Sequence, residues 1–144
     1  MLKIDLHLHS DCSDGVLSPD ELVRELRAKR VSAASLTDHD TIDGVKSFLT
    51  RCRRASIKGV AGVELSAAHD GVLHILGYRF DVENEALRSA LEQNRKARNL
   101  RNVRICEKLR ELGFDITLEE AELCAGTEVV GRPHIARVLW NKGY

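Results

Sequence analysis

Apolar and polar residues alternate over residues 3–8 and then recur every three or four positions over residues 18–30. The alternation predicts a short strand, and the wider spacing predicts a helix with one buried face. Ser18 can cap this helix and Glu21 completes a capping box, so the helix is expected to begin at Pro19. Further along, the pattern predicts a buried strand over residues 33–37, a helix from about 42 to 55, and strands over residues 59–65 and 72–80.

After residue 82 the pattern becomes helical throughout. It predicts a helix over residues 84–112 that ends at Gly113, then helices over about 117–124 and 131–142. His69-Asp70-Gly71 predicts a hairpin-like turn between the third and fourth strands. We therefore expect an α/β fold with a parallel sheet in residues 1–82 and an all-helical subdomain in residues 83–144.

The composition is ordinary for a globular protein, with 43% apolar and 31% charged residues among 144. Lys and Arg together equal Asp and Glu at 22 each, which argues against a general nucleic-acid-binding surface. No apolar run approaches the roughly 18 residues that cross a bilayer, and the first residues lack a signal-peptide pattern. The cysteines form no CxxC pair (Cys12, Cys52, Cys106 and Cys124), so we expect reduced thiols, a cytoplasmic protein and no membrane partner.

Candidate metal ligands begin in the first strand. Alternate residues of a strand face the same side, so Asp5, His7 and His9 share one face. Two imidazoles two residues apart can reach a common metal ion, and the Asp5 carboxylate can orient a ring or touch the metal itself. An HxH pair alone is a weak signal, because histidines of the surface or core also produce it.

The ends of the next strands carry further candidates. His39 follows the second predicted strand, Glu64 ends the third, and Asp14 lies in the loop after His9. Because parallel α/β sheets collect ligands at the carboxyl ends of their strands, these side chains are expected at one rim. His74 lies between apolar residues inside the fourth strand, where a core histidine is the commoner interpretation. The convergence of the other residues favours a ligand there.

The chemistry of these side chains indicates a type of metal centre. Four imidazoles and two carboxylates suit Zn, Mn or Fe better than Ca or Mg. A site with this many ligands can hold two or three divalent metal ions, with Glu64 bridging. Such metals bind an anionic oxygen, generate hydroxide near neutral pH and stabilise a leaving oxygen. Hydrolysis of a phosphate ester needs all three effects, so the pattern predicts a metal-dependent phosphoesterase.

The motifs DLHLHS, SDG, LTDHD, GVELS and HILGY, in this order and spacing, resemble the polymerase and histidinol phosphatase (PHP) family over about residues 3–80. The segment GRPHIAR, residues 131–137, resembles the helical insert of one branch of that family. This branch hydrolyses 3′,5′-nucleoside bisphosphates, AMP-like nucleotides and short RNA 5′ ends. The resemblance implies a distorted seven-stranded β/α barrel with a trinuclear site, an all-helical insert, and a small nucleotide or a short RNA 5′ end as substrate.

The resemblance also assigns ligands to each metal. It matches His7, His9 and Glu64 to one metal, Glu64 and His74 to a second, and Asp14 and His39 to a third. Asp14, His39 and Glu64 are expected to take part in catalysis.

Other residues are expected to support the site. Asp5 and Asp38 are expected to orient the metal-binding side chains by contacting them. Arg132 and His134 match positions that face the active site, so they are expected to contact the phosphate or base of the substrate. Packing at the N-terminus of their helix is the alternative interpretation.

The family barrel continues beyond the insert, where later strands bring a histidine in an Ala-His-Pro-like motif and a final Asp-x-His pair. Residues 81–144 contain neither motif. We therefore expect a truncated barrel that lacks part of the family's ligands and has open sheet edges, through which the chain could self-associate. On this hypothesis the isolated chain binds metal incompletely and is a poor catalyst.

The sequence leaves two other functions open. A histidinol-phosphate phosphatase of the same superfamily would use the same ligands, although the long helix and the GRPHIAR segment favour the nucleotide branch. The other is a non-catalytic module whose long helix presents basic side chains to RNA: Arg95, Lys96, Arg98, Arg101 and Arg104. Such a run of charges is usually a solvated helix face.

Overall fold

The computed structural model describes residues 2–68 and 72–144. Strands and helices follow one another as β1 (Ile4–Leu8), α1 (Pro19–Ala28), β2 (Ala33–Leu36), α2 (Val45–Arg54), β3 (Lys58–Ser66), β4 (His74–Tyr78), α3 (Glu85–Glu111), α4 (Leu118–Ala125) and α5 (Arg132–Asn141). The predicted order of elements is confirmed. The turn expected at residues 69–71 lies outside the described residues. None of the described helices is both long and apolar enough to cross a membrane.

The second helix begins later than the sequence predicts, at Val45 instead of Ile42. Ile42 is buried in a turn before the helix, and its carbonyl accepts a hydrogen bond from the Val45 N–H (3.1 Å). Ile42 therefore continues the helical spacing of apolar residues in the sequence, although the residue itself lies before the helix.

The four strands form one sheet in the order β1-β2-β3-β4. Strands β1, β2 and β3 run parallel, and β4 runs antiparallel to β3. Because of this reversal, His74 at the start of β4 lies opposite Ser66 at the end of β3. The carboxyl ends of the three parallel strands and the amino end of β4 therefore share one rim of the sheet.

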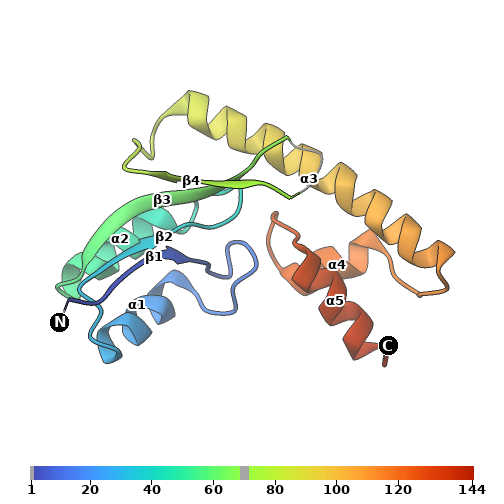
Figure 1. Ribbon diagram of the computed structural model, residues 1–144, viewed down its shortest axis with the longest axis horizontal. Helices are drawn as coiled ribbons and strands as arrows, with labels where there is room; N and C mark the ends of the chain where they lie inside the picture. The colour runs from blue at the N-terminus through green and yellow to red at the C-terminus, as the bar shows by residue number, and fades with distance from the viewer. Residues whose placement is uncertain (1, 69–71) are drawn as a thin grey trace.

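The sheet is curled, like half of a barrel. Tyr78 of β4 donates a hydrogen bond from its hydroxyl to the Leu6 carbonyl in β1 (2.8 Å), although these two strands are the edges of the sheet. Figure 1 shows the four strands side by side in chain order. Helices α1 and α2 pack on the sheet over a buried core of Val23, Leu26, Ala34, Leu36, Phe48, Cys52 and Ile57.

Helix α3 takes part in two cores. Its first half packs against α2 and β3, where Leu91 is buried with Val45 and Val63. Its second half packs against α4 and α5 over Cys106, Ile116, Ala121, Val130, Ile135 and Val138. Figure 1 shows α3 running past the sheet toward α4 and α5, which lie beyond the carboxyl ends of the parallel strands. The helical part of the chain therefore lies next to the rim that carries the predicted ligands.

Local sequence determines several helix ends. Ser18 and Glu21 exchange both capping-box hydrogen bonds at α1, and Thr117 and Glu120 do so at α4. Gly113 follows α3 with a φ of +90°, a conformation that residues with a Cβ rarely adopt. The predicted helix starts at α1 and α4 and the predicted stop after α3 are therefore confirmed.

Candidate metal centre

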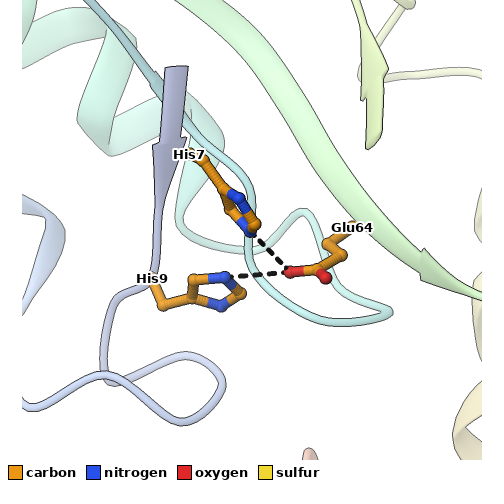
Figure 2. Close-up of side chains that lie close together, drawn as sticks. All are labelled: His7, His9 and Glu64. Carbon is orange, nitrogen blue, oxygen red and sulfur yellow. Dashed lines mark hydrogen bonds and ion pairs between the residues drawn. The ribbon is translucent and has the colours of Figure 1, made fainter. Parts of the chain in front are cut away.

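Two histidines and a glutamate converge at the carboxyl ends of β1 and β3. The Nε2 atoms of His7 and His9 each lie 2.9 Å from Glu64 Oε2. Figure 2 shows both rings directed at this one oxygen, with His7 on β1 and His9 just after it. The three ligand atoms are close enough to bind one cation together.

His39 and His74 extend the site around Glu64. His74 Nδ1 lies 2.8 Å from Glu64 Oε1, and His39 Nδ1 lies 3.5 Å from Oε2. His74 reaches the rim because β4 runs antiparallel to β3 and begins where β3 ends. The structure therefore brings His74 to the other ligands although its sequence neighbours are apolar.

Asp14 completes the cluster from the loop after β1. Its Oδ1 lies 3.2 Å from His9 Nδ1, and its Oδ2 lies 3.6 Å from His39 Nε2. The loop is tight, because a Cβ on Gly15 would lie only 2.3 Å from the His9 carbonyl oxygen. Glycine at this position lets the chain pass close to His9 while the Asp14 carboxylate reaches both rings.

The ligands form three overlapping groups, in which the ligand atoms lie within 4.8 Å of one another: His7, His9 and Glu64; His9, Asp14 and His39; and His39, Glu64 and His74. His39 Nδ1 is buried without a hydrogen-bond partner among the described residues. A buried ring nitrogen left free beside carboxylates is available to a metal, and this set of nitrogen and oxygen donors suits Zn, Mn or Fe. The residues present therefore fit a centre of divalent metal ions.

Burial and charge influence the protonation of these ligands. A hydrogen bond with His9, opposed by burial and helped by the charge of His39, lowers the pKa of Asp14 to about 2. Burial lowers the pKa of His39 to about 4. Burial also acts to raise the pKa of Glu64, but the hydrogen bond with His7 and the charges of His39 and His9 outweigh it and lower that pKa. An ionised carboxylate and a neutral imidazole are the forms that bind metals, and these three shifts favour them.

The pKa of His9 shifts the other way. Burial acts to lower it, but the hydrogen bond with Asp14 and the charges of Asp14 and Glu64 outweigh burial and raise it. His9 therefore lies between two carboxylates, with Asp14 at its Nδ1 and Glu64 at its Nε2.

Asp38, predicted to orient a ligand, lies buried behind the loop that carries Asp14. It accepts hydrogen bonds from the Ser10 N–H (2.7 Å), the Ser10 hydroxyl (2.6 Å) and the Ser13 hydroxyl (2.6 Å). Ser13 Oγ in turn lies 3.4 Å from His9 Nδ1. Burial raises the pKa of Asp38, although these hydrogen bonds oppose the shift. Asp38 thus reaches the metal ligands indirectly, by holding the loop through Ser10 and Ser13.

The other predicted supporting residues lie in different settings. Asp5 accepts a hydrogen bond from the His7 backbone N–H (3.3 Å), so its carboxylate contacts the strand and not the His7 ring. His134 is buried, and its Nδ1 accepts the Gly131 N–H (3.0 Å) at the start of α5. Arg132 is exposed and lines a cavity that His74 also lines. The structure thus places Arg132 on a cavity that the candidate ligand His74 also lines, and it places His134 where its ring caps the start of α5.

A second buried network joins the rim to α3. The Asp40 carboxylate accepts hydrogen bonds from Arg98 Nε (3.1 Å) and Nη2 (2.6 Å), and from Asn94 Nδ2 (3.0 Å). It also accepts the Ser66 N–H (2.8 Å) and hydroxyl (2.7 Å). The Asp40 N–H donates to the Glu64 carbonyl (2.9 Å). The sequence analysis did not predict this network. The one feature of the sequence that pointed to it was the position of Asp40 directly after His39.

The idea that α3 presents one basic face to RNA is wrong for Arg98. This residue is 5% exposed, because its charge pairs with Asp40 inside the protein. Arg95 also turns inward, since its Nη1 donates to the Asp40 carbonyl (3.2 Å) and its Nε lies 3.6 Å from Glu128 Oε2. The basic residues of this helix are therefore divided between buried contacts and solvent.

Comparisons with known proteins agree with this geometry. The sequence matches the PHP domain over residues 5–122. It is 38% identical over 142 residues to a 5′-3′ exoribonuclease of Haemophilus influenzae, covering 98% of this chain and 52% of that protein. It is 32% identical over 145 residues to a 3′,5′-nucleoside bisphosphate phosphatase of Chromobacterium violaceum, covering 99% of this chain and 51% of that protein.

Solved structures show the same fold. An amidohydrolase from Chromobacterium violaceum, solved with bound sulfate and no metal, superposes with a TM-score of 0.88 at 32% identity. The match covers 98% of this chain and 50% of that one. The chain described here therefore spans about half the length of the relatives it matches.

Proposed function

This chain belongs to the PHP domain family, and on that premise we propose that it carries the principal metal-binding part of a metal-dependent phosphoesterase. The observation that carries the proposal is the convergence of four imidazoles and two carboxylates at one rim, in three overlapping groups. When bound there, two or three divalent metal ions (Zn, Mn or Fe, with Mg a poorer fit) supply positive charge for phosphate oxygens and lower the pKa of water.

The residues of the chain take separate parts in this proposal. Glu64 belongs to two of the groups and reaches their histidines through its two carboxylate oxygens, so it would help to hold two of the cations. Asp14 and His39 would hold a third cation, from the loop after β1 and the segment after β2. The catalytic part of Asp14, His39 and Glu64 would then be to hold positive charge close to the phosphate oxygens of a bound substrate.

We propose a nucleotide as the substrate, either a 3′,5′-nucleoside bisphosphate or the 5′ end of a short RNA. The relatives named as a bisphosphate phosphatase and an exoribonuclease support this choice. Arg132 is proposed to contact the substrate, since it lines the cavity next to His74. His134 accepts the Gly131 N–H, and a Cβ on Gly131 would lie 3.3 Å from Asp14 Cβ, which supports a place for His134 at the same edge of the site.

We also propose a division of the chain. Residues 1–82 would be the first part of a larger seven-stranded barrel, and residues 83–144 its helical insert. Two observations support this division. The relatives are about twice as long as the match, and β1 and β4 are the two edges of the described sheet.

Release of inorganic phosphate, or of a mononucleotide from RNA, across a panel of substrates tests the function. The chain is freed of metal with a chelator, Mn²⁺, Zn²⁺ or Fe²⁺ is added, and three substrates are compared: adenosine 3′,5′-bisphosphate, a short 5′-phosphorylated RNA and histidinol phosphate. We expect metal-dependent turnover of the first two, at a low rate in the isolated chain. Histidinol phosphate as the preferred substrate would instead favour the histidinol-phosphatase alternative.

A matched pair of variants separates the metal centre from the loop that carries it. Asp14→Asn should reduce metal content and turnover, whereas Asp11→Asn should leave both near the wild-type values. Asp11 lies in the same loop but is exposed and belongs to none of the ligand groups. Metal-independent binding of RNA that weakens steeply with salt would contradict the proposal and favour a non-catalytic module.

A further inference from the structure

A tyrosine side chain joins the two edge strands of the sheet. Tyr78 in β4 donates a hydrogen bond from its hydroxyl to the Leu6 carbonyl in β1 (2.8 Å). Tyr78 lies four residues after His74, so the two side chains share the face of β4 that is directed at Glu64. The register partner of Tyr78 on β3 is Gly62, which contributes no side chain to that face. Tyr78 therefore links the strand that carries the candidate ligand His74 directly to β1.

Strand β1 is irregular where the tyrosine hydroxyl reaches it. Between Asp5 and Leu8 it advances three residues, while its partner β2 advances two, from Ala34 to Leu36. A bulge of this kind leaves one residue out of the ladder, bends the strand, and often re-aims a side chain next to a functional site. Because β1 is an edge of the described sheet, its ladder is formed with β2 alone. The backbone beside His7 is therefore held weakly by the sheet itself.

The position of the His7 ring depends on this backbone. Its side chain is 50% exposed, and within the described part of the chain its ring makes one hydrogen bond, with Glu64 Oε2 (2.9 Å). Half of the side chain is therefore without packing that could hold the ring in place. His9 differs, because its ring lies between the carboxylates of Asp14 and Glu64 and is 21% exposed. A displacement of β1 would consequently move the His7 Nε2 atom away from Glu64 more readily than it would move His9.

We propose that Tyr78 is a positioning residue for the metal centre, which holds the backbone at Leu6 so that the His7 ring reaches its cation. This inference rests on the proposed function, because it takes the group of His7, His9 and Glu64 as one metal position. The hydroxyl acts through the strand, since it contacts the carbonyl of the residue before His7. Partners that orient a ligand raise metal affinity, because less order has to be created when the metal binds. One hydrogen bond of this kind corresponds to about 2- to 10-fold in affinity.

Binding of Co²⁺ to the full chain tests this role with matched tyrosine variants. The affinity is measured by competition with a coloured chelator, and the visible absorption of bound Co²⁺ reports its coordination. Tyr78→Phe keeps the ring and removes the hydroxyl, so it should weaken Co²⁺ binding by about 2- to 10-fold and alter the absorption. Tyr144→Phe is the control, because it removes a hydroxyl that accepts the Asp115 N–H (3.1 Å) in the helical part of the chain. It should leave both the affinity and the absorption at the wild-type values.

A double variant shows whether Tyr78 acts through His7. In His7→Ala the ligand is already absent, so adding Tyr78→Phe should cause no further loss of Co²⁺ affinity.

Three results would overturn the positioning role and leave the proposed function standing. They are an additive loss in the double variant, wild-type affinity and absorption in Tyr78→Phe, and a lower unfolding temperature of metal-free Tyr78→Phe with unchanged Co²⁺ binding. A wild-type chain that binds no Co²⁺ would overturn both the positioning role and the proposed function.

Discussion

Arg98 Nη2 and Asp40 Oδ2 lie 2.6 Å apart, and the two side chains are only 4% and 0% exposed. Asp40 directly follows the candidate ligand His39, and its N–H donates to the carbonyl of the candidate ligand Glu64 (2.9 Å). Arg98 lies 58 residues further along the chain, on α3. This buried ion pair therefore ties the helical part of the chain to the rim that carries the candidate metal ligands.

Removing Arg98 should destabilise the protein strongly. Arg98→Met would leave the Asp40 carboxylate buried without its cation, and loss of one partner of a buried pair costs about 3–5 kcal/mol. We expect urea denaturation to show a decrease of this size in the free energy of unfolding. Metal affinity should fall as well, because Asp40 positions the backbone of Glu64. A decrease below about 1 kcal/mol would show that the pair contributes no more than a surface ion pair.

The double variant Asp40→Asn/Arg98→Met is the control for this prediction. It removes the unpaired negative charge of the buried Asp40 carboxylate, so it should be more stable than Arg98→Met alone. Asparagine suits position 40 because Asp40 has a φ of +50°, a conformation that Asn also tolerates. If the double variant were as unstable as the sum of both single variants, the two residues would not be coupled.

Glu64 and Asp14 should differ in how many metal ions their loss removes. Glu64 belongs to two of the three ligand groups, whereas Asp14 belongs to one. Glu64→Gln should therefore reduce the metal content per chain about twice as much as Asp14→Asn, as measured by elemental analysis after dialysis. Asp11→Asn again serves as the control. Equal losses in the two variants would mean that the groups do not act as separate positions.

The convergence of most candidate ligands could be predicted from the sequence because their positions obey local rules. His7 and His9 are two residues apart on a strand, and His39 and Glu64 stand at the ends of parallel strands, where ligands gather. The position of His74 was harder to predict, since it depends on the direction of β4 and not on the apolar residues next to His74 in the sequence. The capping signals at Ser18 also predicted the start of its helix correctly.

The Asp40–Arg98 network could not be predicted, for a physical reason. An arginine on a helix has the same sequence pattern whether it faces solvent or a buried carboxylate. The partner that decides between these settings is 58 residues away and depends on how α3 crosses the rim. The same argument applies to Arg101, which lines the same cavity as Arg132 and His74 because of tertiary packing alone.

Gly15 should be intolerant of even a small side chain. A Cβ at this position would lie 2.3 Å from the His9 carbonyl oxygen and 2.8 Å from the Ser10 carbonyl carbon, so the loop must move. Gly15→Ala should cost about 1–3 kcal/mol, as overpacking does, and weaken metal binding by displacing Asp14. Thermal unfolding with and without added Mn²⁺ measures both effects. Val16→Ala, at a neighbouring position that is 71% exposed, should leave both close to wild type.

The open edges of the sheet should make the isolated chain self-associate. Strands β1 and β4 are the two edges, and they expose Ile4 (58%) and Ile75 (51%). Unpaired strand edges with apolar side chains attract other strands, and such association occurs at micromolar to millimolar concentration. We expect light scattering coupled to gel filtration to show dimers or larger species at about 100 µM. Ile4→Lys/Ile75→Lys should shift the chain toward monomer, because charged residues discourage edge pairing. Leu123→Lys, on α4 and 84% exposed, controls for a general gain in solubility, and an equal effect of this variant would locate the association elsewhere.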